Sequence, residues 1–433
     1  MRLRLSVSAV LCLLVTAVGD AQRPNINVIA EQYVRLVLAM GVHEADYVDA
    51  YYGPPAWRTE AEDRRVSLQG IRIQTDALAR QLVQLDPGGG PENVDRLRHQ
   101  YLTGQVHALR SRVAMRTGRK MTFDEESKEL YDAVAPTHPE SVFTAALEDL
   151  ERLLPGPGSL RDRLDAFRDR FVIPKERLDA TFRAAIEGCR TRTRRYIELP
   201  REESFEVEYV TNQSWSAYNW YQGNYHSVIQ VNTDLPIRAD AAIDLACHEG
   251  YPGHHVYNVL LEKELVRGRK WIEYSVYPLF SPQSLIAEGT ANYGIEMAFP
   301  SDERLRFERD VIFPAAGLDP STAEQYYAVL AVLDRLSYAG NEAARRYLDG
   351  RITASGAADF LEQFALSTRA RAEQRVRFID QYRSYVINYN LGKDMVRDHI
   401  ARRVGPSGDV RKRWDEFERL LSTPRQPSGL LSR

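Results

Sequence analysis

The chain has 433 residues, of which 44% are hydrophobic and 27% are charged, a composition typical of globular proteins and not of disordered or fibrous ones. The net charge of −3 gives no sign of the concentrated lysine and arginine that a nucleic-acid-binding surface needs, so we expect no nucleic-acid partner. The length allows two or three structural units.

Residues 1–21 have the three parts of a secretory signal peptide. Two arginines precede an apolar run over residues 5–18, and Gly19 and Ala21 place small residues where a signal peptidase cleaves. The run is shorter than the roughly 20 apolar residues of a membrane span, although an uncleaved N-terminal anchor is the alternative. We therefore expect an exported protein, periplasmic or extracellular, whose mature chain has no membrane span.

Two cysteines, Cys189 and Cys247, remain after removal of this segment. An oxidising compartment permits a disulfide but does not require one. Cys247 precedes a histidine that we expect to bind metal, in a helix that should be buried. We therefore expect both thiols to be free.

Most of the sequence after residue 21 has apolar residues at helical spacing. The pattern predicts helices over residues 27–40, 68–85 and 174–195. Thr122 and Glu125 have the spacing of a capping box at the start of another helix. The fold class that this pattern predicts is mainly α.

Residues 204–233 depart from the helical pattern. Apolar and acidic residues alternate over 205–209, and residues 225–232 are rich in β-branched and aromatic types. We expect these stretches to form a small antiparallel sheet or hairpin. After Pro236 the helical pattern resumes. We expect an N-terminal helical region over 22–200 and a region over 201–433 that carries the chemistry, joined as one continuous fold.

Three of the nine histidines fall within eight residues, in the segment His248-Glu249-Gly250-Tyr251-Pro252-Gly253-His254-His255. Neutral imidazole is the commonest protein ligand of zinc, and a catalytic zinc has three protein ligands and one open position. A carboxylate beside the first histidine can take a proton from the attacking water. The segment therefore predicts a zinc site with His248 as a ligand and Glu249 as the general base.

The second ligand is His254 or His255. On a straight helix, His254 would lie about 9 Å along the axis and about 120° around from His248, and His255 would lie about 10.5 Å away. Pro252 cannot donate a hydrogen bond to the carbonyl of residue 248, and Gly253 tolerates unusual dihedral angles. We expect a kink or bulge here that returns the second histidine to the first. We favour His254, and expect His255 to bind substrate or stabilise developing charge.

The third ligand should be a carboxylate on a nearby helix. Serine and proline at 281–282 start a helix that reaches residue 299, with the serine hydroxyl as its cap. We expect Glu288 of this helix to bind the metal, with Gly289 relieving a crowded position. Asn292 is placed to hydrogen-bond a ligand histidine. Glu296 is the rival ligand.

Three tyrosines near the C-terminus, Tyr382, Tyr385 and Tyr389, fall on one helical face. They form an aromatic core stripe, or else Tyr389 or Tyr385 donates a hydrogen bond to the oxyanion of a tetrahedral intermediate. Of the two, we favour Tyr389 for the catalytic role.

The segment 248–255, followed by Glu-Gly-Thr-Ala-Asn-Tyr at 288–293, resembles a bacterial family of unknown function in the gluzincin-type zinc peptidase clan. Its members usually show His-Glu-x-x-Pro-Gly-His-His, then Glu-Gly-x-Ala-x-Tyr, then a helix with tyrosine and glycine near the C-terminus. The first motif matches fully. The second has Thr290 where tryptophan is common, and residues 385–393 match the third in spacing only. The resemblance implies a large multi-helix gluzincin-like metallopeptidase fold, but no substrate. It also implies that the strand over residues 225–232 holds a peptide at its edge, although the strand could equally be plain scaffold.

We therefore expect a zinc-dependent hydrolase of peptides or small amides, with the ion bound by His248, His254 and Glu288. Two histidines and one carboxylate also suit a non-haem iron enzyme, but such an enzyme has no need for Glu249. A third interpretation is an exported helical binding protein with a non-catalytic metal. Closed structural sites usually have four ligands rich in cysteine, which this segment lacks.

Overall fold

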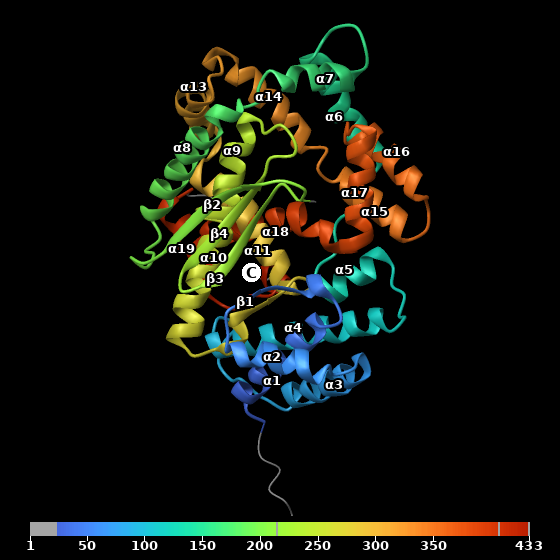
Figure 1. The fold of residues 1–433 in the computed structure, drawn as a ribbon, viewed down its shortest axis with the longest axis vertical. Helices are drawn as coiled ribbons and strands as arrows, with labels where there is room; N and C mark the ends of the chain where they lie inside the picture. The colour runs from blue at the N-terminus through green and yellow to red at the C-terminus, as the bar shows by residue number, and fades with distance from the viewer. Residues whose placement is uncertain (1–23, 214, 406–407, 432–433) are drawn as a thin grey trace, which may run out of the picture.

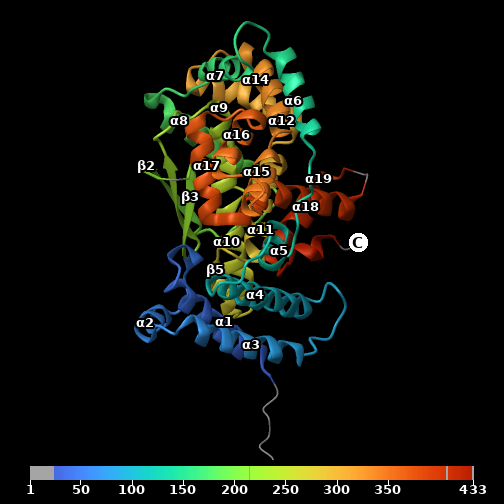
Figure 2. The same ribbon diagram turned by 90° about the vertical axis from the view of Figure 1, so that its right-hand side faces the viewer.

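The computed structural model describes residues 24–213, 215–405 and 408–431, so the expected signal segment lies outside the described residues. The fold is mainly α-helical with two small sheets, which confirms the predicted fold class. The N-terminal helices form one end of the molecule, and a three-stranded sheet lies along one side (Figures 1 and 2). Within the described residues, no helix has the length and apolar character needed to cross a membrane.

The N-terminal end consists of short and medium helices around one strand. Its elements are α1 (Ile26–Gly41), β1 (Val48–Tyr51), α2 (Pro55–Arg64), α3 (Leu68–Val83), α4 (Val94–Arg116) and α5 (Phe123–Tyr131). The helices expected over 27–40 and 68–85 are confirmed as α1 and α3. The capping box is also confirmed, since the Thr122 hydroxyl accepts from the backbone N–H of Glu125 and the Glu125 carboxylate accepts from that of Thr122.

The next three helices lie towards the opposite end of the molecule and beside the sheet (Figure 1). They are α6 (Glu140–Leu153), α7 (Leu160–Asp169) and α8 (Lys175–Arg194). Pro174 occupies the N-cap of α8, so the helix predicted over 174–195 is confirmed. α8 passes beside the sheet and buries one face, including Cys189, towards the centre of the molecule.

The sheet contains β2 (Ser204–Val210), β3 (Ala217–Gly223) and β4 (His226–Asn232), in the order β2-β4-β3. Both predicted strands exist, but the expected antiparallel pairing between them was wrong. β2 pairs with β4 in parallel, and β4 pairs antiparallel with β3. The physical reason is a tight hairpin at Asn224 and Tyr225, both with positive φ, which gives β4 a partner that immediately precedes it in the chain.

The second half of the chain supplies the centre of the molecule and the side opposite the sheet. Its elements are α9 (Ala239–Leu245), η2 (Ala246–Gly250), α10 (His254–Leu261), η3 (Glu262–Gly268), η4 (Ile272–Ser275), β5 (Val276–Pro278), α11 (Pro282–Ala298), α12 (Ser301–Phe307), η5 (Glu308–Ile312), α13 (Phe313–Ala316), η6 (Pro320–Thr322), α14 (Ala323–Asp334), α15 (Ala339–Leu348), α16 (Ala354–Phe364), α17 (Arg369–Tyr382), η7 (Arg383–Val386), α18 (Ile387–Val404), α19 (Val410–Ser422) and η8 (Pro427–Leu431). β5 pairs antiparallel with β1 and so ties this half to the N-terminal end.

Two glycines allow the closest helix contact at the centre, between α11 and α18 (Figure 1). A Cβ atom on Gly289 would lie 2.5 Å from the carbonyl carbon of Gly392, and one on Gly392 would lie 2.8 Å from the carbonyl oxygen of Leu285. Any side chain here would push the backbones apart. The expectation that Gly289 relieves a crowded position is therefore confirmed. The contact sets the tyrosines of η7 and α18 beside Glu288.

Candidate metal centre

The segment between His248 and His254 is a broken helix. α9 passes into η2, a π-helical turn, and the chain leaves helical geometry at residues 251–253, with a cis peptide bond between Tyr251 and Pro252. The N–H of Gly253 donates to the carbonyl oxygen of Cys247 at 2.9 Å, and a Cβ on Gly253 would lie 1.8 Å from the carbonyl oxygen of His248. Only glycine fits here. The kink predicted at Pro252 and Gly253 is confirmed.

This break brings together the three side chains expected to bind metal. Nε2 of His254 lies 3.1 Å from Nε2 of His248. Oε2 of Glu288 lies 3.3 Å from Nε2 of His248 and 3.8 Å from Nε2 of His254. Among the described residues, these three side chains form a cluster whose ligand atoms all lie within 4.8 Å of one another, close enough to hold a metal ion. They come from η2, α10 and α11, so the site joins the broken helix to the central one.

The three atoms fit a divalent ion such as zinc. Ligands at about 2.0–2.1 Å in a tetrahedron are separated by roughly 3.3 Å, close to the three distances observed. Oε2 of Glu288 is buried and accepts no hydrogen bond from the part of the chain that the structure describes, which is costly unless a cation occupies the space beside it. The Nε2 atoms of His248 and His254 face each other, so one cation could bind both. The site can therefore hold a metal ion.

Besides the two histidines, hydrogen bonds from other neighbours hold Glu288 in place. Its Oε1 accepts a hydrogen bond from the Tyr385 hydroxyl at 2.8 Å, which leaves Oε2 to face the histidines. Asn292 donates to the backbone oxygen of Glu288 at 3.0 Å. The rival ligand, Glu296, pairs with Lys393 at 2.8 Å and lies outside the three-residue group.

The Ser281 cap was wrong in detail. Ser281 is the N-cap residue of α11, but its hydroxyl does not accept a hydrogen bond from the first turn of the helix. The hydroxyl instead donates to the carbonyl oxygen of Pro278 at 2.8 Å. The helix nevertheless begins at Pro282 as expected, because proline at the first position has no N–H to satisfy.

Opposite charges at this site shift the ionisation of its members. Burial acts to lower the pKa of His248, but the adjacent Glu288 and Glu249 carboxylates outweigh burial and raise the pKa to about 9. A side-chain hydrogen bond to Asn292 contributes in the same direction, as expected for a residue that orients a ligand histidine. For Glu288, burial raises the pKa of the carboxyl, but the adjacent imidazoles of His248 and His254 lower it well below its usual range.

Glu249 lies in the wall of a large cleft beside the three ligand atoms. The cleft has a volume of about 1360 Å³, and His248, His254, Glu288 and Glu249 all line it. Glu249 is only 6% exposed, and burial raises the pKa of its carboxyl although both histidines oppose the shift. Asn219 of β3 donates to the backbone oxygen of Glu249 at 2.7 Å and fixes this turn.

His255 points away from the ligand atoms. It is fully buried and is not part of the cleft lining. Its Nδ1 lies 2.9 Å from the hydroxyl of Ser227, and its Nε2 lies 2.9 Å from Oε2 of Glu203. Both ring nitrogens therefore have protein partners, so this position does not offer His255 to a substrate. The side chain instead connects α10 to β4 and to the segment before β2.

The two tyrosines proposed as oxyanion donors differ in their partners. Tyr385 is buried and its hydroxyl donates to Glu288, whereas Tyr389 lines the cleft and has no side-chain hydrogen bond to the described residues.

The strand that was expected to offer a free edge to a peptide, β4, does not have one, because β4 is paired on both sides. β2 and β3 are the edge strands, and residues 215–220, which include the start of β3, line the cleft.

Asp49 is a cleft residue that the sequence did not indicate. Burial and the nearby Glu288 and Glu249 charges raise the pKa of its carboxyl to about 8, and its Oδ1 accepts a hydrogen bond from the Tyr218 hydroxyl. The residue follows Val48 in β1, far along the chain from the histidine segment. No local motif marks it, since only the pairing of β1 with β5 brings it here.

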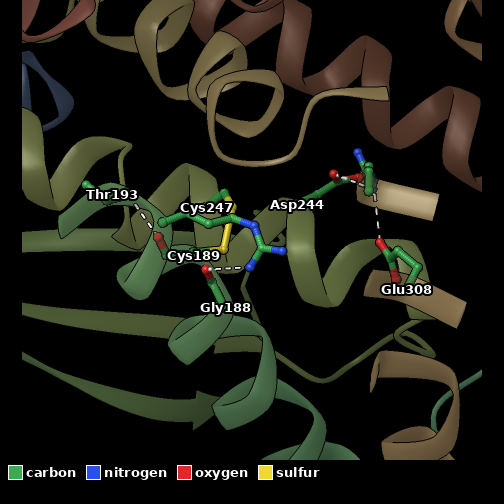
Figure 3. Close-up of a disulfide and its surroundings, with 8 residues drawn as sticks. Gly188, Cys189, Thr193, Asp244, Cys247 and Glu308 are labelled. Carbon is green, nitrogen blue, oxygen red and sulfur yellow. Dashed lines mark hydrogen bonds and ion pairs between the residues drawn. A yellow bond between two sulfur atoms is a disulfide. The ribbon is translucent and has the colours of Figure 1, made fainter. Parts of the chain in front are cut away.

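The expectation of two free thiols was wrong. Cys189 of α8 and Cys247 of η2 form a disulfide with a Cα–Cα distance of 5.7 Å (Figure 3). Both cysteines are fully buried. The sequence separates them by 58 residues, and only the packing of α8 against η2 brings them together. The bond fastens the turn that carries His248 to a long helix.

Loss of this disulfide should lower the free energy of unfolding. In the chain-entropy account, closing a loop of this length stabilises the fold by about 4 kcal/mol. Thermal unfolding of the Cys189→Ala/Cys247→Ala double variant should therefore occur several degrees below that of the parent. Thiol titration of the denatured, unreduced parent, produced from residue 22 onward, should detect no thiol, whereas the Cys189→Ala variant should show one. Two thiols in the parent would contradict the bond.

Comparison with known proteins gives only distant structural likenesses. No family model matches the sequence, and no curated protein matches it. A protein from Colwellia psychrerythraea described as a lipoprotein has a TM-score of 0.49 and 15% identity, covering 93% of this chain and 74% of its own. A carboxypeptidase from Pyrococcus furiosus has a TM-score of 0.40 and 14% identity, covering 93% and 91%. Likenesses at this level carry no argument about function.

Proposed function

We propose that this protein is a zinc-dependent hydrolase of peptide or small amide bonds. The observation that carries the proposal is the meeting of His248, His254 and Glu288 on one point in the wall of the cleft, with Glu249 beside them. Three ligands from protein side chains leave room for a further ligand, which is the arrangement of catalytic rather than structural zinc.

The proposed mechanism gives Glu249 the proton transfers. Bound zinc supplies positive charge that acidifies water and polarises a carbonyl. The Glu249 carboxylate takes a proton from water as the water oxygen bonds to the amide carbon, and then gives that proton to the amide nitrogen. The carbon–nitrogen bond breaks, and the products are a carboxylic acid and an amine. No oxidant or reductant is needed.

Other side chains support this reaction without transferring the proton. Tyr385 orients Glu288 through Oε1. We assign the oxyanion hydrogen bond to Tyr389, because it lines the cleft with its hydroxyl free of side-chain partners in the described part of the chain. We assign His255 a positioning role, in which its bonds to Ser227 and Glu203 fix the start of α10 and therefore the orientation of His254.

The alternatives fit the site less well. An iron oxygenase has no use for a buried glutamate directly after the first histidine, and a binding protein with a structural metal needs no large cleft open to that metal. Export remains part of the proposal, since a buried disulfide is typical of proteins that fold in an oxidising compartment.

Metal removal tests the proposed function. We expect the purified protein to cleave members of a mixed peptide library, and chelation with 1,10-phenanthroline to reduce the rate in proportion to the metal removed. About one equivalent of zinc should restore it. Metal analysis of protein purified without added metal distinguishes zinc from iron. Cleavage that persists in protein shown to be metal-free would contradict the proposal.

A further inference from the structure

Arg375 of α17 is a cation in the cleft wall without a carboxylate partner among the described residues. Its guanidinium carbon lies 4.7 Å from the ring centre of Phe378, and no hydrogen bond or ion pair joins it to another side chain of residues 24–213, 215–405 or 408–431. The carboxylates on its own helix are engaged elsewhere, since Glu373 pairs with Arg369 and Asp380 accepts from Tyr347. The residue is half-buried, and burial lowers the pKa of its guanidinium.

The other basic residues of the cleft are all neutralised. Each of them has a carboxylate partner: Lys393 pairs with Glu296, Arg397 with Asp394, Arg304 with Asp244 and Arg335 with Asp149. Acidic side chains also outnumber basic ones along the lining. A half-buried arginine left unpaired in such surroundings is costly unless an anion from outside completes it. Its planar fork is suited to a carboxylate.

A row of aromatic side chains connects Arg375 to the metal ligands. The ring centres of Phe378 and Tyr382 are 4.6 Å apart, those of Tyr382 and Tyr385 are 6.1 Å apart, and those of Tyr385 and Tyr389 are 5.8 Å apart. All four rings line the same cleft as the candidate ligands. Arg375 and Tyr389 both line this cleft, and the Arg375 charge opposes the rise in the pKa of Tyr389 that burial and Glu288 cause. A series of aromatic rings therefore runs from the cation to Tyr385, whose hydroxyl donates to Glu288.

We infer that Arg375 binds a carboxylate of the substrate, so that the enzyme prefers peptides with a free carboxylate close to the bond that it hydrolyses. The inference rests on the proposed hydrolase function and specifies its substrate class. Two sources share this chemistry, namely the C-terminal α-carboxylate of a peptide and the side chain of an aspartate or glutamate. A free C-terminus would make the enzyme a carboxypeptidase.

The test compares three N-acylated peptides on the zinc-loaded enzyme. The first ends in phenylalanine with a free carboxylate, the second is its C-terminal amide, and the third is an amide with glutamate in place of phenylalanine. We expect kcat/KM for the first peptide to exceed that for the second on the order of 100-fold, as for a desolvated charge pair. In Arg375→Met this ratio should fall to about one, and Arg375→Lys should retain part of it.

Arg377→Met is the matched control, because Arg377 is an exposed arginine on the same helix, and it should keep the parental ratio. A ratio that changes with Arg375 while metal content and thermal unfolding stay parental reports on substrate binding and not on folding. Preference for the glutamate amide over the phenylalanine amide, lost in Arg375→Met, would support carboxylate binding and place the carboxylate on a side chain. A parental ratio near one for both carboxylates, or a ratio unchanged in Arg375→Met, would overturn the inference. Failure to cleave any peptide with zinc bound would instead contradict the proposed function.

Discussion

Replacement of Glu249 by glutamine is expected to lower kcat by about 1,000- to 10,000-fold and to leave the bound metal in place. The substitution preserves the shape of a side chain that is 6% exposed and has no side-chain hydrogen bond to lose within the described residues, so the fold should be retained. Glutamine cannot accept the proton of the attacking water. Glu249 is also not one of the three side chains whose atoms converge on the candidate metal position, so zinc should still bind.

Single-turnover hydrolysis and metal analysis on the same preparations measure the two halves of this prediction. Tyr389→Phe is the companion variant, and it should lower kcat by only about 100-fold, as expected for removal of one oxyanion donor. Glu296→Gln, which removes a carboxylate of the cleft outside the ligand group, should stay close to the parent. A Glu249→Gln enzyme with full metal and parental kcat would remove Glu249 from the mechanism.

Replacement of His254 by alanine is expected to abolish tight metal binding and, with it, hydrolysis. Loss of an outer hydrogen-bond partner already costs metal sites about 10- to 100-fold in affinity, and loss of a direct ligand should cost more. His254 occupies the first turn of α10, where alanine is a good helix former, so the fold should survive. Competition with a fluorescent zinc chelator measures the affinity.

His255 provides the contrast, because the two adjacent histidines have opposite environments. Alanine at 255 leaves the buried Glu203 and Ser227 without their histidine partner, which should lower the free energy of unfolding by about 3 kcal/mol. Folded His255→Ala should still take up zinc. The assignment of the second ligand would be wrong if His255→Ala lost the metal while folded and His254→Ala kept it.

The sequence indicated the metal centre better than its surroundings. The features that indicated it are local in the sequence: histidine and glutamate at 248–249, proline and glycine at 252–253, and Glu288 in a helix with its own start signals. The chemistry of each residue type limits the roles that it can have in such a site. The break at Pro252 and Gly253 followed from backbone sterics alone. The break did not decide between His254 and His255, so both histidines remained open until the fold showed which ring faced Glu288.

The features that the sequence did not indicate depend on contacts between distant segments. Cys189 and Cys247 meet because α8 packs against η2, and no periodicity in either segment encodes that contact. Asp49 enters the cleft through the pairing of β1 with β5. The aromatic alternation around Trp220 was a usable signal for β3, and the tight turn at Asn224 was a signal for its hairpin with β4.

Arg375 had no sequence signal either. One arginine among many on an amphipathic helix is ordinarily a solvated residue, and its lack of a partner is visible only when the neighbouring carboxylates are placed. The same holds for Tyr389, whose sequence spacing suits an aromatic stripe as well as a cleft wall. Each residue is available to a substrate because its polar group has no side-chain hydrogen-bond or ion-pair partner within the described fold.

Anomalous X-ray diffraction from crystals of the zinc-loaded protein, recorded on both sides of the zinc absorption edge, tests the central claim most directly. We expect one strong peak at about 2.0–2.2 Å from Nε2 of His248, Nε2 of His254 and Oε2 of Glu288. A zinc peak bound by other residues, with these three side chains pointing apart, would contradict the account.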